Sequence, residues 1–597
     1  MSSTAELPSH TPDAALMRAL QVAVTGLFGP PAAPLQVQPT NPEFEGTHTL
    51  VCFPITRQSK KSPEETARMI GEQLIGNDSP VATFNVVKGF LNLSLRDGVW
   101  VSAFNALNTD RQFGTFPSNG REIMVEYSSP NTNKPLHLGH LRNNFLGYAV
   151  AEMYRALGYR VHRVQIINDR GIHICKSMAA WELFGNGETP ASSGMKGDHL
   201  VGKYYVLFDK EYRRQIGELE AGGVTKEVAE KDAPIMKRAV TMLQLWEQKD
   251  PVILDLWRSM NGWVYEGFEQ TYRRMGVSFD KLYYESETYL LGKSEVMKGV
   301  EQGVFFRKED GSVWVDLTGD GLDQKVLLRS DGTSVYMTQD IGTAILRFRD
   351  FPGIEGQVYT VGNEQEYHFK VLFLILKKLG FAWAEKCFHL SYGMVDLPTG
   401  RMKSREGTVV DADDLMQEMV SEAARQSAEL GKADPSDELN EMVGLGALKY
   451  FLLKVDPKKR MMFDPTESIQ LQGNTGPFIQ YTHARICALL RKAEEQGLSW
   501  NGTFDPDGIH AAERELIRLI SRYPETLSAA AAGYAPSVLA NYAYELAKGY
   551  NQFYQSVRIF GETDQQKLLF RIALSGQVAK VIRISMSLLG IGVPEKM

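Results

Sequence analysis

Between residues 121 and 170 the apolar positions change spacing twice, from that of a strand to that of a helix and back. Residues 123–127 form a short apolar run that predicts a strand, and a polar loop follows as far as Pro135. Beyond His137, apolar side chains recur every four residues, the pattern of one helical face, and Gly158 is a natural helix end. Residues 160–168 predict a second strand. This order predicts the first βαβ unit of a doubly wound parallel sheet, whose ligands bind at the carboxyl ends of the strands.

Upstream of this unit the pattern predicts a separate α+β domain. Helical periodicity covers residues 14–27 and 63–74, and apolar residues dominate a strand-like run at 90–95. The turn-rich stretch 116–120 separates this part from the parallel sheet. We therefore predict an N-terminal domain at residues 1–117.

Downstream, the chain alternates between the two patterns and then becomes helical. A charged stretch without strand pattern, at about 185–265, predicts a helical insertion, and an Asp-Gly pair at 310–311 predicts a hairpin turn. After about residue 448 the stripes are nearly all helical. The predicted fold class is α/β: a Rossmann-like doubly wound core at 118–450 that contains the insertion, followed by an all-α bundle at 451–597.

Composition narrows the protein class without identifying a chemistry. The 597 residues are 43% hydrophobic and 23% charged, with a formal net charge of -7, as in ordinary globular proteins. The four cysteines are widely separated and form no CxxC pair, so we expect neither a zinc site nor a disulfide framework. No basic leader and no apolar run of about 18 residues is present, so we expect a cytoplasmic protein without membrane spans.

The candidate chemistry lies where the first helix of the sheet begins. His137 and His140 lie three residues apart in its first turn, where free backbone N–H groups and the helix dipole favour phosphate. Gly139 between them would let a flat base approach the backbone. A bare HxGH also fits two histidines that merely cap a helix.

The longer run around these histidines carries a resemblance. VEYSSPNTNKPLHLGHLRNNFLG, residues 125–147, is similar to the signature region of class I aminoacyl-tRNA synthetases, specifically the arginyl enzymes. The resemblance implies a nucleotide site that includes Pro130, Lys134, His137, Gly139 and His140. It implies catalysis by Lys134 and the two histidines.

The second class I signature, a Lys-Met-Ser-Lys-Ser loop, resembles residues 401–407 here. Met402, Lys403 and Ser404 would bind ATP, and Lys403 and Arg405 would assist catalysis. The second lysine of the motif is replaced by Ser404. The arginyl enzymes share this loss and carry a lysine ahead of HxGH, a position that Lys134 fills. An ammonium from the opposite wall would serve the same phosphates.

The resemblance also implies an arginine pocket. A guanidinium requires planar carboxylate partners. Tyr336 and Asp340, four residues apart, Gln365 further on and Glu285 before them resemble the family's guanidinium-facing residues. The residues at the other end of the substrate are Ser129, Asn131 and His137. Asp340 alone would also fit a helix cap, and Glu285 and Gln365 alone would fit solvated surface residues.

The flanking domains resemble the RNA-binding parts of the same enzymes. In the N-terminal domain, Phe90 and Asn92 resemble a pair that reads a tRNA loop, although Phe90 also fits a strand core. In the bundle, Gln480, Tyr481 and Arg485 are the candidates for RNA contact.

We therefore predict that the chain, as a monomer, ligates L-arginine to tRNA(Arg) through an arginyl-adenylate, with ATP and Mg²⁺ as substrate complex and no structural metal or organic cofactor. Three alternatives remain at this point: a catalytically silent tRNA-binding protein, a class I synthetase for another amino acid, and a small HxGH nucleotidyltransferase. The length and the helical bundle argue against the last of these.

Overall fold

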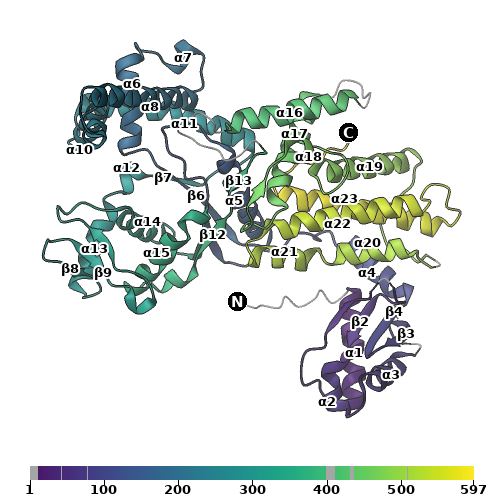
Figure 1. Ribbon diagram of the computed structural model, residues 1–597. Coiled ribbons are helices and arrows are strands. Elements are labelled where there is room, and N and C mark those ends of the chain that lie inside the picture. The colour runs from purple at the N-terminus through teal and green to yellow at the C-terminus, as the bar shows by residue number, and fades with distance from the viewer. Residues whose placement is uncertain (1–10, 42, 77, 399–409, 430–435, 507) are drawn as a thin grey trace.

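A computed structural model describes residues 11–41, 43–76, 78–398, 410–429, 436–506 and 508–597. Its N-terminal part is an antiparallel sheet with helices packed on it, at the bottom of Figure 1. The strand order is β1-β2-β4-β3, for β1 (Val37–Pro39), β2 (His48–Val51), β3 (Val81–Val87) and β4 (Phe90–Leu95). The helices of this part are α1 (Pro12–Phe28), α2 (Thr56–Ser59), α3 (Pro63–Leu74) and α4 (Asp97–Thr109).

Local capping explains where the two main helices of this domain begin. The hydroxyl of Thr11 accepts a hydrogen bond from the N–H of Ala14, and Ser62 caps α3 in the same way at Glu65. A proline follows each cap at the first helical position. Helix α3 therefore begins at the predicted residue, and α1 begins two residues earlier than predicted.

The central sheet has five parallel strands in the order β12-β11-β5-β6-β7. These strands are β5 (Glu122–Glu126), β6 (Arg160–Ile167), β7 (Lys281–Tyr284), β11 (Ile354–Gly362) and β12 (Cys387–Tyr392). Helix α5 (Leu138–Ala156) connects β5 to β6, and Gly158 after it is left-handed with φ +85°. The predicted βαβ opening of a doubly wound sheet is confirmed.

Helices cover both faces of this sheet, as a parallel sheet requires. Met124 of β5 packs on one face with Leu346 of helix α14 (Tyr336–Asp350), whereas Val125 belongs to the core that α5 closes on the other face. Helix α5 approaches the sheet very closely, because a Cβ added at Gly147 would lie 2.3 Å from the Cβ of Tyr127.

Two insertions extend from the sheet. The first is helical: α6 (Ile172–Phe184), α7 (Pro190–Ser193), α8 (Gly197–Ala221), α9 (Lys226–Asp232), α10 (Pro234–Glu247) and α11 (Pro251–Met275). It ends at the left-handed Gly276, about ten residues later than predicted, because the apolar stripe of α11 continues without a helix-breaking signal. The second insertion is an antiparallel sheet of β8 (Phe306–Arg307), β9 (Val313–Val315) and β10 (Lys325–Leu328), with the predicted hairpin turn at Gly311.

The C-terminal part is the predicted helical bundle, yellow and green in Figure 1. Its helices are α16 (Ala412–Glu429), α17 (Asp437–Leu453), α18 (Pro465–Ser468), α19 (Gly476–Glu495), α20 (Ala511–Ser521), α21 (Tyr523–Ala532), α22 (Pro536–Ser556) and α23 (Gln565–Leu588). The predicted boundary at residue 450 falls inside α17. Among the described residues, no helix combines the length and apolar character needed to span a bilayer.

Candidate active site

The turn that begins α5 is built from hydrogen bonds of its own two histidines. His137 is the N-cap, and its Nδ1 accepts from the N–H of Gly139 at 3.1 Å. The Nδ1 of His140 accepts from the N–H of His137, also at 3.1 Å. Because both Nδ1 atoms accept, the proton of each neutral ring lies on Nε2. The histidines are therefore both helix caps and N–H donors beside the free amides of the first turn.

Burial keeps these rings neutral. It lowers the pKa of His137 to about 3, with the charge of Lys134 adding to the effect. The pKa of His140 is lowered well below its usual value by burial, then by His137 and Lys134. The pKa of Lys134 itself is lowered by burial. Neutral Nε2–H groups can donate to an anionic ligand, and the protonation state of the two rings does not change near neutral pH.

The loop before this turn is fastened to the neighbouring elements. Ser128 has a left-handed backbone with φ +57°, and its N–H donates to the side chain of Asn143 in α5 at 2.6 Å. The carbonyl of Pro130 accepts from the N–H of Asn168 at the end of β6, and Asn131 pairs with the same residue. Ser129 is half-buried and Asn131 is exposed. The loop therefore lies across the carboxyl ends of β5 and β6.

The predicted guanidinium-binding residues lie at the same edge of the sheet. Glu285 directly follows β7, and burial raises its pKa to about 7, opposed by Arg170 and supported by Asp169 and Asp340. Asp340 in α14 is paired with the Nε2 of His368 in α15 (Glu366–Lys378) at 2.5 Å. The structure thus places the two carboxylates, Glu285 and Asp340, in one electrostatic environment.

The two remaining pocket candidates are more open. Tyr336 is the first residue of α14 and is 77% exposed. Gln365 ends the short helix η3 (Asn363–Gln365), which follows β11, and is also exposed. Both are at the rim, and neither contributes a described contact to Glu285.

One acidic residue at this edge was not predicted from the sequence as a site residue. Asp169 follows β6, is 1% exposed, and accepts from the N–H and Oγ of Ser286 at 2.9 and 2.7 Å. It also accepts from the hydroxyl of Tyr265. Ser286 is the neighbour of Glu285, so Asp169 fixes the backbone there. Its only signal in the sequence is an acid directly after a predicted strand.

The second signature falls outside the described residues, so Met402, Lys403, Ser404 and Arg405 remain predictions. The chain that follows it is described and is bonded to the HxGH turn. The N–H of Leu138 donates to the carbonyl of Val410 at 3.2 Å, and the N–H of Ala412 donates to that of Leu136 at 3.0 Å. These bonds fasten residues 410–412 to the start of α5.

Two of the five RNA candidates are buried, which corrects their assignment. Gln480 is fully buried, and its amide donates to the carbonyls of Met442 and Gly592, so it holds the bundle together. Asn92 is 2% exposed and accepts from the hydroxyl of Thr49 at 2.6 Å. In this structure neither side chain is available to a partner, because each satisfies groups of its own domain.

The other three candidates retain their roles as predictions. Phe90 is half-buried in β4, with Phe53 edge-on at 5.4 Å between ring centroids. The guanidinium of Arg485 lies over Tyr481 at 4.9 Å and over Tyr554 at 5.4 Å. Such stacked aromatic and guanidinium groups are typical of surfaces that bind unpaired bases.

Two family models together match most of the chain. The model described as tRNA synthetases class I (R), catalytic domain, matches residues 102–464. The DALR anticodon binding domain matches residues 479–597. The first match contains the HxGH turn, and the second contains Tyr481 and Arg485.

Individual relatives match over nearly their whole length. A protein named Arginine--tRNA ligase from Bacteroides thetaiotaomicron is 57% identical over 95% of this chain and 96% of its own. A protein of the same name from Flavobacterium psychrophilum is 55% identical over 97% and 98% of the two chains. The solved arginyl-tRNA synthetase of Thermus thermophilus has the same fold, with a TM-score of 0.75 at 24% identity over 98% of this chain and 99% of that one.

Proposed function

The chain belongs to the arginyl-tRNA synthetases of class I, and from that premise we propose that its parallel sheet joins L-arginine to tRNA(Arg) with ATP. The carboxylate of arginine attacks the α-phosphate of ATP, and pyrophosphate leaves. A terminal ribose hydroxyl of the tRNA then attacks the carbonyl of the adenylate, and AMP leaves. The observation that carries this proposal is the pair of neutral Nε2–H donors on His137 and His140 at the first turn of α5.

In this proposal the turn stabilises charge on the phosphates. His137, His140 and the ammonium of Lys134 donate to phosphate oxygens, together with the free amides of the helix start. Mg²⁺ accompanies the triphosphate as part of the substrate. Lys403 and Arg405 of the second signature would assist as further cations, and Gly139 and Pro130 border the nucleotide. No covalent enzyme intermediate is needed, because positioning and charge stabilisation suffice.

Arginine is recognised by its guanidinium in the acidic corner, the half-buried place where Glu285 and Asp340 come together. Glu285 and Asp340 face it as carboxylates, while Tyr336 and Gln365 close the rim. Ser129, Asn131 and His137 hold the α-amino and carboxylate end. A guanidinium would replace His368 as the partner of Asp340, and its positive charge would favour release of the proton of Glu285 to solvent.

The transfer RNA is bound outside the sheet. Arg485, with Tyr481 and Tyr554, provides a stacking surface for unpaired bases in the bundle, and Phe90 with Phe53 provides one in the N-terminal domain. We further propose that the enzyme works as a cytoplasmic monomer.

Exchange of labelled pyrophosphate into ATP tests the adenylation step. We expect exchange to depend on arginine and to fall by about 10² to 10³ in His140→Asn. Asparagine keeps an oxygen that can accept from the N–H of His137, so the helix cap survives while the Nε2–H donor is lost. The assay is run with and without tRNA, because the order of binding decides whether adenylation occurs alone.

The same variant separates the enzyme from a silent tRNA-binding relative. Filter binding of tRNA(Arg) should be unchanged in His140→Asn. If the wild-type protein binds tRNA but shows no exchange under either condition, the catalytic proposal is wrong.

A further inference from the structure

Helix α8 of the insertion lies against the segment before the HxGH turn at Gly202. A Cβ added at Gly202 would lie 2.7 Å from the Cδ of Pro135 and 3.7 Å from the Cα of Lys134. The first distance is shorter than carbon atoms tolerate, and the atom it meets belongs to a rigid ring. Only glycine at this position therefore lets α8 lie against the segment that carries Lys134.

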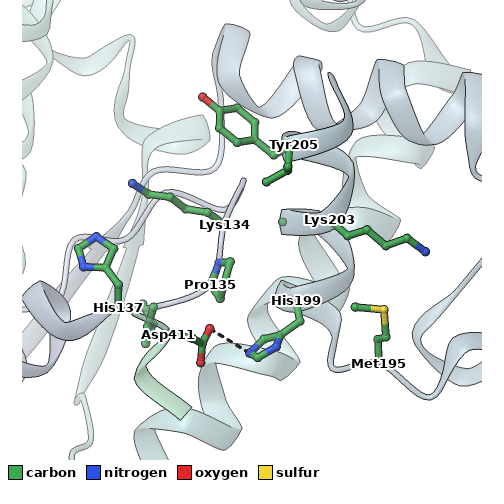
Figure 2. Close-up of a pocket in the computed structure, with 11 residues that line it drawn as sticks. Lys134, Pro135, His137, Met195, His199, Lys203, Tyr205 and Asp411 are labelled. Atoms are coloured by element: carbon green, nitrogen blue, oxygen red, sulfur yellow. Dashed lines mark ion pairs between the residues drawn. The ribbon is translucent and has the colours of Figure 1, made fainter. Parts of the chain in front are cut away.

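Figure 2 shows what this contact separates. The side chains of Lys134 and His137 extend to one side of the segment, and α8 lies on the other. A cavity of about 260 Å³ adjoins the contact, lined on one wall by Lys134, Pro135 and His137 and on the other by α8. Helix α8 thus supports the segment from the side opposite to the side chains of Lys134 and His137, which are the proposed phosphate-binding groups.

A polar cluster fixes the start of the same helix. The ammonium of Lys196, the N-cap of α8, lies 2.5 Å from Asp413 and 3.1 Å from the fully buried Asp198. It also donates to Thr271 of α11. His199 lies 3.4 Å from Asp411 and 3.3 Å from Asp413, and the first of these pairs is drawn in Figure 2.

The geometry of Asp198, His199 and Asp413 resembles that of a cation site, because their ligand atoms lie within 4.8 Å of one another. Lys196 already places its ammonium between the two carboxylates. The cluster is therefore an ion-pair network centred on Lys196, which joins the start of α8 to Asp413 of α16.

The cluster and the glycine contact hold the same turn from two directions. Asp411 pairs with His137 in a short backbone bridge, and the flanking Val410 and Ala412 bond to Leu138 and Leu136. The N–H of Asp413 donates to the carboxylate of Asp411, so the residues that His199 and Lys196 hold continue directly into this bridge.

We propose that helix α8 positions the HxGH turn for ATP, with Gly202 and Lys196 as positioning residues. This inference rests on the proposed function only in identifying ATP as the ligand of the turn. It assigns a role to the insertion, for which the sequence yields no residue-level prediction. Neither residue belongs to the proposed substrate-binding groups, and Gly202 has no side chain, so their substitution should act through Lys134.

The first experiment compares two glycines of the same helix. In Gly202→Ala the methyl group displaces Pro135, and a shift of even part of an ångström at reacting groups is costly. We expect kcat/KM for ATP in pyrophosphate exchange to fall at least tenfold, while KM for arginine changes less than twofold. Gly217→Ala on α8, where no atom lies within 4 Å, should leave every parameter unchanged.

The second experiment removes a charge and keeps a similar side-chain length. Lys196→Met should lower kcat/KM for ATP in the same selective way, because Asp413 loses its ammonium partner beside the bridge. Lys203→Met on the same helix, which loses an ion pair with the distant Glu188, is the matched control. Lys196→Arg should restore part of the loss.

The possible outcomes distinguish a failure of the positioning role of α8 from a failure of the proposed synthetase activity. Equal ATP kinetics in Gly202→Ala and Gly217→Ala, or equal losses for ATP, arginine and tRNA in both Gly202→Ala and Lys196→Met, would overturn the positioning role. Should Gly202→Ala not fold, the Lys196 pair decides alone. Wild-type exchange is measured in parallel, so a failure of the proposed activity is recognised independently of any variant.

Discussion

At the residue scale, the HxGH histidines are helix caps, and this geometry is compatible with their proposed role as phosphate donors. The rings cap α5 through Nδ1, and that same bond leaves Nε2–H as the donor of each neutral ring. The sequence could supply the residues and their spacing but not the tautomer, which depends on the closed turn. Gln480 shows the opposite case. The sequence predicted that this polar helical residue contacts RNA, yet its amide donates to two buried carbonyls of distant segments.

The acidic corner predicts a pH dependence for arginine. Glu285 of the free enzyme has a raised pKa of about 7, caused mainly by burial, so it is protonated below that pH and ionised above it. A guanidinium binds the ionised form. Between pH 8 and pH 6, kcat/KM for arginine should therefore fall by up to about tenfold, because this quantity follows the titration of the free enzyme.

Glu285→Gln is the control for this titration. It should have a low kcat/KM for arginine that changes little over the same interval, while KM for ATP stays near the wild-type value. A variant that keeps the full wild-type pH dependence would show that another group titrates.

At the element scale, the sequence predicted the elements of the βαβ unit. For the helical insertion it predicted only the position in the chain. The predicted strands and helix of the first βαβ unit agree with β5, α5 and β6 within about two residues, because strand and helix periods contrast sharply there. The insertion was recognised by its lack of strands. Its support of the catalytic turn could not be predicted, because the contact of Gly202 with Pro135 joins segments about 70 residues apart.

The close approach of α5 to the sheet predicts a large effect of one methyl group. Gly147→Ala would place a carbon 2.3 Å from Tyr127 in the core, and we expect a loss of about 1–3 kcal/mol in the free energy of unfolding. Gly262→Ala in α11, with open space around it, should instead stabilise by about 0.5–1 kcal/mol. Urea unfolding followed by circular dichroism measures both. Similar values for the two variants would contradict the packing.

At the scale of the whole molecule, the domains are joined more closely than their sequence boundaries suggest. Helix α4 reaches the bundle through Asp97 with Arg514 at 2.8 Å, and through Asn105 with the backbone of Phe504. One large hydrophobic cluster contains residues from Leu16 to Ile591, and two smaller clusters lie beside it. Helix α17 crosses the predicted boundary at residue 450 because a helical pattern does not reveal which core it packs against.

Because they share this large hydrophobic cluster, the parallel sheet and the two flanking parts are packed together. The parallel sheet holds the proposed arginine and ATP sites, and the flanking parts carry the proposed stacking surfaces around Phe90 and Arg485. A synthetase requires both, whereas a small nucleotidyltransferase requires only the first. The central claim therefore concerns the complete reaction on tRNA.

The most direct test is charging of total tRNA by the full chain, with ATP, Mg²⁺ and each of the twenty amino acids in turn. We predict that arginine alone is attached, to tRNA(Arg), and that Glu285→Gln lowers the rate while leaving tRNA binding intact. Attachment of a different amino acid, or tRNA binding without any charging, would contradict the account.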